Sequence, residues 1–135
     1  VVKIDAYGST DEGVSFYIEL DGKRLFHAGD LNNWHWQEES STIEVEEAGR
    51  MYHAVLKAVA KEHPRMDAVF FPIDPRMVTD IGRGAREFLE AISCISIVPM
   101  HFWGGFDEAN AFESEARALG VRFVHLTQYG ETFEI

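Results

Sequence analysis

The segment GVSFYIELDGKRLFHAGD, residues 13–30, decides the fold of the first third of the chain. It contains two strand-like runs, Val14–Leu20 and Arg24–Ala28, on either side of Asp21-Gly22. An Asp-Gly pair between two such runs is the strongest short-range signal for a β-hairpin. Lys3–Tyr7 is predicted as a further strand before the hairpin, so we expect an antiparallel meander.

A long amphipathic helix is predicted to follow the meander, over Thr42–Glu62. Ser41 and Glu44 form a capping-box pattern at its start, and Pro64 ends it. Apolar residues recur along it at spacings of three and four, which places one stripe on one face. The stripe consists of Val45, Ala48, Tyr52, Val55 and Val59.

The remainder of the chain alternates between buried strands and helices. Strands are predicted at Ala68–Phe71, Ile95–Val98 and Val121–His125, with Thr132–Ile135 as a candidate edge strand. The first helical stripe between them runs through Ile81, Ala85, Phe88 and Ile92, and the second through Ala109, Phe112, Ala116 and Leu119. Such alternation implies crossover connections and parallel neighbouring strands. We therefore predict an α/β fold with a mixed sheet and about three helices.

Three loops hold nearly all of the unusual polar residues: Gly29–Glu39, Pro72–Asp80 and Met100–Asp107. Each follows a predicted strand, and loops after parallel strands gather at the sheet edge where α/β proteins bind ligands. Asp30 places a carboxylate there after a glycine, although an aspartate after a strand is more often a turn former or a helix cap. His101 could offer a neutral imidazole to a metal, or be a hydrogen-bonded histidine in an aromatic cluster. Asp74 lies between two prolines, where an ordinary turn is the alternative.

The hairpin segment that ends at Asp30, followed much later by IVPMHFW at residues 97–103, resembles the second half of the metallo-β-lactamase superfamily. The branch of cytoplasmic metal-dependent hydrolases related to the ascorbate-phosphate lactonases is the most similar. The resemblance implies that residues 1–135 form a single domain, the C-terminal half of a four-layer αβ/βα sandwich. It implies that Asp30 is the bridging aspartate and His101 the last histidine ligand of a mono- or dinuclear zinc or manganese site.

The first-half signature of that superfamily, a His-x-His-x-Asp-His run, is missing here. The chain also opens directly on a strand, without an initiator methionine, so we expect the N-terminal half of the same fold to be its partner. Alone, the chain is expected to be inactive, and its uncovered sheet face to favour homo-oligomers. With the second half, the resemblance implies hydroxide attack on a lactone, phosphoester or amide. The alternative is a non-catalytic α/β module that binds a small molecule or a partner.

Further residues near the predicted ligands are candidates for lining the substrate site or supporting the ligands. They are His27, Asn32, His35 and Trp103, each with a packed structural role as the alternative. Gly82-Arg83-Gly84 could cradle a phosphate, but it lacks the Lys-Ser/Thr of a nucleotide loop, and an ordinary helix start is favoured. Cys94 lies in an apolar run and is predicted as a small core residue.

Composition limits the classes of partner. A formal net charge of −11 argues against nucleic acid and against anionic membrane surfaces, both of which require clusters of Lys and Arg. A single cysteine cannot form an internal disulfide, which is typical of a reducing compartment. No signal-peptide pattern opens the chain, so we expect a cytoplasmic protein with a small-molecule substrate.

Overall fold

The computed structural model describes all residues, 1–135, and contains one six-stranded sheet with the strand order β1-β2-β3-β4-β5-β6. Strands β1 (Lys3–Tyr7), β2 (Ser15–Leu20) and β3 (Lys23–His27) pair antiparallel, which confirms the predicted meander. Strands β4 (Arg65–Pro72), β5 (Ser93–Met100) and β6 (Arg122–Phe123) continue the sheet in parallel from β3. The sheet is therefore mixed, as the sequence predicts.

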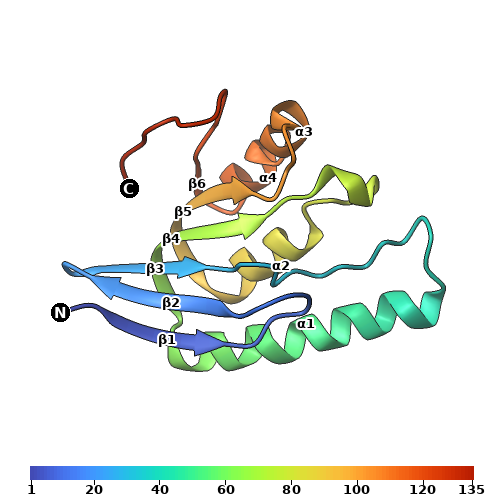
Figure 1. The fold of residues 1–135 in the computed structure, drawn as a ribbon, viewed down its shortest axis with the longest axis horizontal. Helices are drawn as coiled ribbons and strands as arrows, with labels where there is room; N and C mark the ends of the chain where they lie inside the picture. Colours follow the sequence, from blue (N-terminus) through green and yellow to red (C-terminus); the bar gives the residue numbers. More distant parts are fainter.

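Helices connect the parallel strands. Helix α1 (Thr42–Glu62) joins β3 to β4, α2 (Arg83–Ala91) joins β4 to β5, and α3 (Phe106–Asn110) with α4 (Glu113–Ala118) joins β5 to β6. A short 3-10 turn, η1 (Pro75–Met77), precedes α2. Because strand order follows chain order, the crossovers place their helices on the same face of the sheet, behind the strands in Figure 1. No helix is both long and apolar enough to cross a bilayer.

Two predicted elements differ from the structure. The helix predicted through Ala109 and Leu119 is divided into α3 and α4. Phe112 N bonds to the carbonyl of Ala109, three residues earlier, and this tighter turn interrupts the α-helical hydrogen bonds. The edge strand predicted at Thr132–Ile135 does not form. Instead, the segment is held by the Arg122 guanidinium, which donates to the Glu134 carbonyl at 2.7 Å, and Phe133 packs near Phe70.

The start of α1 confirms the predicted capping box. The Ser41 hydroxyl accepts a hydrogen bond from Glu44 N at 3.2 Å, and the Glu44 carboxylate accepts one from Ser41 N at 2.7 Å. These two bonds satisfy backbone donors that have no partner inside the helix. They also lower the pKa of Glu44. The helix consequently begins at the predicted residue.

Aromatic rings bring the sheet and the helices together. Phe88 of α2 lies 5.3 Å from Phe26 of β3 and 5.3 Å from Phe71 of β4, centroid to centroid. Tyr52 of α1 is fully buried against Phe71, and its hydroxyl donates to the Gly84 carbonyl at 2.7 Å. Cys94 is buried as predicted, and burial raises the pKa of its thiol to about 12. These contacts form a single core on the helical face of the sheet.

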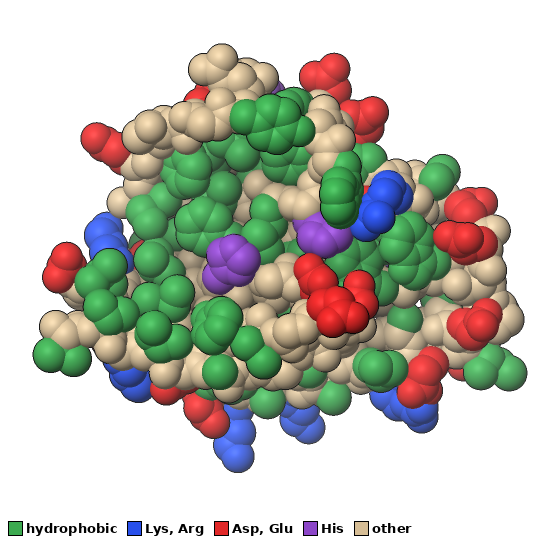
Figure 2. All heavy atoms as spheres, viewed as in Figure 1, with side chains coloured by type: hydrophobic (Ala, Val, Ile, Leu, Met, Phe, Trp, Pro, Cys, Tyr) green, Lys and Arg blue, Asp and Glu red, His purple; other side chains and the backbone are tan.

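The opposite face of the sheet is apolar and largely uncovered over the meander. Ile4, Phe16 and Leu20 project from β1 and β2 with 57%, 37% and 40% of their surface exposed. Ile18 of β2 lies between Ile4 of β1 and Leu25 of β3 in the sheet register. His27 of β3 lies opposite Phe16 of β2. Figure 2, in the same orientation as Figure 1, shows hydrophobic side chains gathered on this face. We call it the open face.

Replacing Ser41 by Ala is expected to lower the free energy of unfolding by about 1 kcal/mol, because the capping hydroxyl is lost. The measurement is urea denaturation followed by far-UV circular dichroism. Ser40→Ala is the matched control, because the Ser40 side chain makes no hydrogen bond in the structure. Equal effects of the two substitutions would contradict the capping role.

Candidate metal centre

The candidate site lies where three parallel strands end. Asp30 follows β3, Asp74 follows β4, and His101 comes directly after β5. Because β3, β4 and β5 are neighbours in the sheet, their carboxyl ends share one edge and bring the three loops together. The register places Phe71 opposite Pro99 and Pro72 opposite Met100, so Asp74 and His101 leave the sheet at the same level.

His101 lies between two carboxylates. Its Nε2 is 3.3 Å from Asp30 Oδ1, and its Nδ1 is 2.9 Å from Asp74 Oδ2. The backbone of His101 has a positive φ of 64°, which is uncommon for a residue with a side chain. This conformation turns the chain sharply at the end of β5. The structure therefore brings the predicted residues Asp30, Asp74 and His101 into contact.

Asp74 is a fully buried carboxylate with a complete set of partners. Arg76 donates to both of its oxygens, at 3.0 Å from Nε to Oδ1 and 2.6 Å from Nη2 to Oδ2. Trp103 Nε1 adds a longer bond at 3.3 Å. Burial alone would raise the pKa of Asp74, but the hydrogen bonds from Arg76 and His101 outweigh it and leave the pKa below its ordinary value. An ionised carboxylate only accepts hydrogen bonds, so His101 Nδ1 must donate and Nε2 is the atom that faces Asp30.

Aromatic rings enclose the imidazole. The Trp34 ring lies 5.4 Å from that of His101, and its Nε1 donates to the Asp30 carbonyl at 2.7 Å. Trp103 approaches His101 edge-on at 5.5 Å. The Arg76 guanidinium lies 4.7 Å from the centre of the Trp103 ring and 5.9 Å from that of Trp36. Arg76 was not predicted from the sequence; it lies two residues after Asp74 in the same loop, but that position indicates a role only when Asp74 is buried.

The other predicted site residues lie apart from this contact. His27 is exposed, and its Nδ1 accepts from Gly29 N at 3.1 Å. Asn32 and His35 are buried, so neither is accessible to a substrate. The Asn32 side chain accepts from Asn33 N, and His35 Nε2 lies 3.1 Å from the Asp80 carbonyl. These hydrogen bonds hold the loop after β3 in place. Neither the Asn32 nor the His35 side chain bonds to Asp30 or His101.

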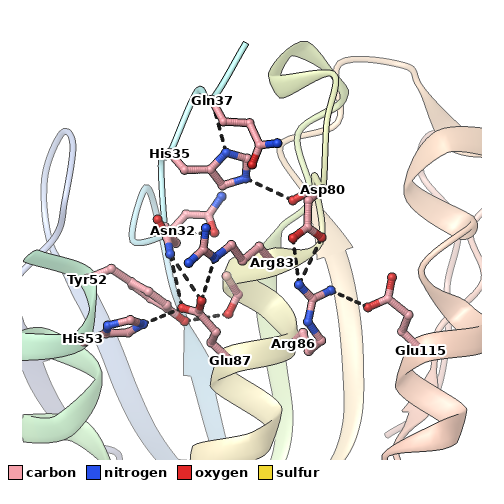
Figure 3. A network of polar contacts seen from close by, with 12 residues as sticks. Asn32, His35, Gln37, Tyr52, His53, Asp80, Arg83, Arg86, Glu87 and Glu115 are labelled. Carbon is pink, nitrogen blue, oxygen red and sulfur yellow. Dashed lines mark hydrogen bonds and ion pairs between the residues drawn. The ribbon is translucent and has the colours of Figure 1, made fainter. Parts of the chain in front are cut away.

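Figure 3 shows the polar network that fixes the loop of Asp30 against α2. Glu87 of α2 accepts from Asn33 Nδ2 at 3.3 Å and from Arg83 Nε at 2.9 Å, and lies 2.7 Å from His53 Nε2 of α1. Burial alone would raise the pKa of Glu87, but these three hydrogen bonds outweigh it and lower the pKa. One carboxylate thus ties the loop to both helices.

The Gly82-Arg83-Gly84 segment lets the start of α2 pack closely against the loop after β3. A Cβ added at Gly84 would come within 1.9 Å of Asn32 Oδ1, so only glycine lets the loop lie so close to α2. Arg83 is paired with Glu87, and Arg86 with Asp80 and Glu115. The arginines of this helix start therefore already have carboxylate partners.

Two donor atoms suited to a divalent metal, Asp30 Oδ1 and His101 Nε2, converge at the sheet edge. Structural and catalytic zinc sites usually take three or four protein ligands. The chain contains no group of three or more His, Cys, Asp or Glu side chains placed to hold a metal ion. The residues present therefore fit part of a metal site, and the remaining ligands would have to come from elsewhere.

No protein-family model matches the chain. Among solved structures, it is similar to a mutant of the CmlA beta-hydroxylase, with a TM-score of 0.59 and 11% identity over 93% of this chain and 30% of that chain. A candidate metal-dependent hydrolase from Parabacteroides distasonis matches with a TM-score of 0.52 and 12% identity over 91% and 49%. A candidate zinc-dependent hydrolase of the metallo-β-lactamase superfamily from Thermotoga maritima aligns at 0.40 and 19% identity, over 74% and 41%, too low a score to carry an argument.

The chain spans less than half the length of each of these structures. At such low identities the matches show the fold alone. The two matches with TM-scores above 0.5 confirm the predicted α/β class with its mixed six-stranded sheet.

Replacing Glu87 by Gln is expected to cost about 1–3 kcal/mol of unfolding free energy at pH 7, because the ionised carboxylate holds three partners. The folded-state pKa of Glu87 is lowered, so its stabilisation is present above the unfolded value and lost as the pH falls. The difference between variant and wild type should therefore shrink below about pH 4.

The measurement is urea denaturation of both proteins between pH 3 and pH 8. Glu90→Gln is the matched control, because Glu90 lies exposed on the same helix and has no hydrogen-bond partner. A Glu87→Gln effect that is constant across this pH range would contradict the stabilising role of the carboxylate.

Proposed function

We propose that this chain forms one half of a metal-dependent hydrolase of the metallo-β-lactamase superfamily, with Asp30 and His101 as two of its metal ligands. The observation that carries the proposal is the convergence of Asp30 Oδ1 and His101 Nε2 at 3.3 Å on the ligand-binding edge of the sheet. The fold match and the resemblance of the segments at 13–30 and 97–103 support it.

The residues of the chain prepare the donor atoms. The Asp74 carboxylate holds His101 Nδ1–H, which in the neutral ring leaves the Nε2 lone pair on the side of Asp30. Such a carboxylate–histidine contact orients a metal ligand and raises its basicity. Arg76 and Trp103 in turn fix Asp74. A bound divalent zinc or manganese ion would lower the pKa of a coordinated water and polarise the substrate oxygen.

We further propose that the remaining ligands come from a second half of the same fold, packed on the open face. That face presents Ile4, Phe16 and Leu20 to solvent, and uncovered apolar surface of this kind favours association. Two ligands alone bind zinc weakly, so the isolated chain is expected to have no hydrolase activity. A second copy of the chain could cover the same face, but it would supply only another aspartate and histidine.

The fold does not select the reaction, since both a hydroxylase and a candidate hydrolase match it. Hydrolysis is proposed because of the Gly29-Asp30 and Pro99–Trp103 motifs. Lactones, phosphoesters and amides all fit attack by a metal-activated hydroxide. Asp30 would bridge or orient the metal, and His101 would complete one coordination sphere.

The test is a zinc titration of the chain, observed through long-range ¹H–¹⁵N NMR signals of the histidine rings. We expect the Nε2 signal of His101 to move first, with a dissociation constant weaker than about 1 μM because two ligands are too few for tight binding. Asp30→Asn should abolish this response.

His125→Ala is the control, because His125 also lies near a carboxylate, with Nδ1 3.2 Å from Glu113, but outside the candidate site. It should leave the titration of His101 unchanged. Tight stoichiometric zinc binding by the chain alone would contradict the division of the site between two halves. A zinc response of His101 that survives Asp30→Asn, or zinc shifts confined to other histidines, would remove the metal assignment and favour a non-catalytic module.

A further inference from the structure

An apolar hollow of about 550 Å³ lies beside His101, and the proposed chemistry does not account for it. One wall is the end of β5 and the loop after it, with Met100, Phe102 and Trp103, and the other is the segment after β6, with Leu126 and Tyr129. The volume is within the range of small-molecule sites. Both walls follow parallel strands at their carboxyl ends, and His101 lines the hollow as well as the candidate metal centre.

The segment after β6 is held as a wall although it has no regular secondary structure. Asn110 of α3 donates to the Leu126 carbonyl at 2.7 Å and accepts from Leu126 N at 3.3 Å. The Glu131 carboxylate accepts from Thr127 N at 2.7 Å and from Gln128 N at 3.3 Å. These bonds fix the turn on which Tyr129 lies.

Aromatic contacts connect Tyr129 to the opposite wall. The ring of Phe106 lies 5.3 Å from that of Tyr129 and 5.0 Å from that of Phe102, both in edge-to-face geometry. Such pairs are stabilising beyond the area that they bury. Both sides of the hollow are thus anchored, and a ligand would meet a largely formed apolar surface.

The chemistry of the lining excludes most charged ligands. No Lys, Arg, Asp or Glu lines the hollow, and His101 is its one titratable group apart from the Tyr129 phenol. The net charge of −11 adds a repulsive field for anions. An ionic group placed here would lose hydration without gaining a partner.

We propose that this hollow binds an uncharged aromatic or branched-alkyl group of the substrate, whose reacting bond then lies at His101. The inference builds on the proposed hydrolase function and narrows its substrate class. Among the candidates, it favours substrates that carry an apolar substituent beside the reacting bond, because the lining offers a charged substituent no Lys, Arg, Asp or Glu partner. Leu126 and Tyr129 are then specificity-determining residues supplied by the segment after β6.

The experiment compares the binding of 2-naphthamide and 2-naphthoate to the chain by NMR, with EDTA present to remove metal. The two probes share the same ring system and differ in charge. We expect 2-naphthamide to bind more tightly and to give nuclear Overhauser contacts to the Leu126 and Met100 methyl groups. Tyr129→Ala and Leu126→Gln should each weaken its binding about three- to tenfold.

Two controls separate the hollow from other apolar surface. Ile43→Ala removes a side chain that is 78% exposed on α1, and Phe16→Ala removes a ring from the open face; neither should change the binding of 2-naphthamide. Tyr129 is also 78% exposed, so its truncation is expected to leave the fold intact, which near-UV circular dichroism checks. A loss with Phe16→Ala but not with Tyr129→Ala would overturn the proposal, as would preferred binding of 2-naphthoate.

Asp30→Asn distinguishes this inference from the proposed function. The variant should lose the zinc response and still bind 2-naphthamide. If wild-type chain binds 2-naphthamide in the hollow but shows no zinc response at His101, the metal assignment fails and the apolar site stands. If zinc binds and 2-naphthamide does not, the substrate class is wrong and the metal centre stands.

Discussion

The contact between the buried Asp74 carboxylate and His101 Nδ1, 2.9 Å long, is the interaction on which the candidate site depends. Asp74 is inaccessible to water and is held ionised by Arg76, so it can only accept a hydrogen bond from its partner. That constraint fixes which nitrogen of His101 faces Asp30. The aromatic rings of Trp34 and Trp103 then limit the freedom of the imidazole. Because the imidazole is already oriented, its side chain loses little conformational entropy when a metal binds.

The same sheet creates the site and leaves it incomplete. Its parallel half brings the ends of β3, β4 and β5 to one edge, where Asp30, Asp74 and His101 meet. The helices cover one face of the sheet and bury a single hydrophobic core rich in aromatic rings. The open face, in contrast, exposes Ile4 and Phe16 to solvent. The unpaired apolar face and the two-ligand donor set have a common explanation in our proposal. Both would be completed by a second half of the fold, while the apolar hollow beside His101 is already formed within the chain.

Local signals in the sequence predict much of this arrangement. The Asp21-Gly22 turn locates the meander, and the capping box of Ser41 and Glu44 places the start of α1 at the residue observed. The loops after β3, β4 and β5 follow from strand order alone. What the sequence could not show depends on contacts between distant residues. The division of α3 from α4, the course of the segment around Phe133 and the burial of His35 against Asp80 are all of this kind. Arg76 was missed because its role appears only once Asp74 is known to be buried.

If Asp74 orients His101 so that a bare Nε2 faces Asp30, the neutral His101 ring must adopt one particular tautomer. Long-range ¹H–¹⁵N correlation NMR of the uniformly labelled chain distinguishes the two ring nitrogens by their chemical shifts. We expect a protonated Nδ1 and an unprotonated Nε2. A neutral ring protonated on Nε2 would contradict this expectation, because that nitrogen would then have no lone pair for a metal and Asp74 would not be orienting the ligand.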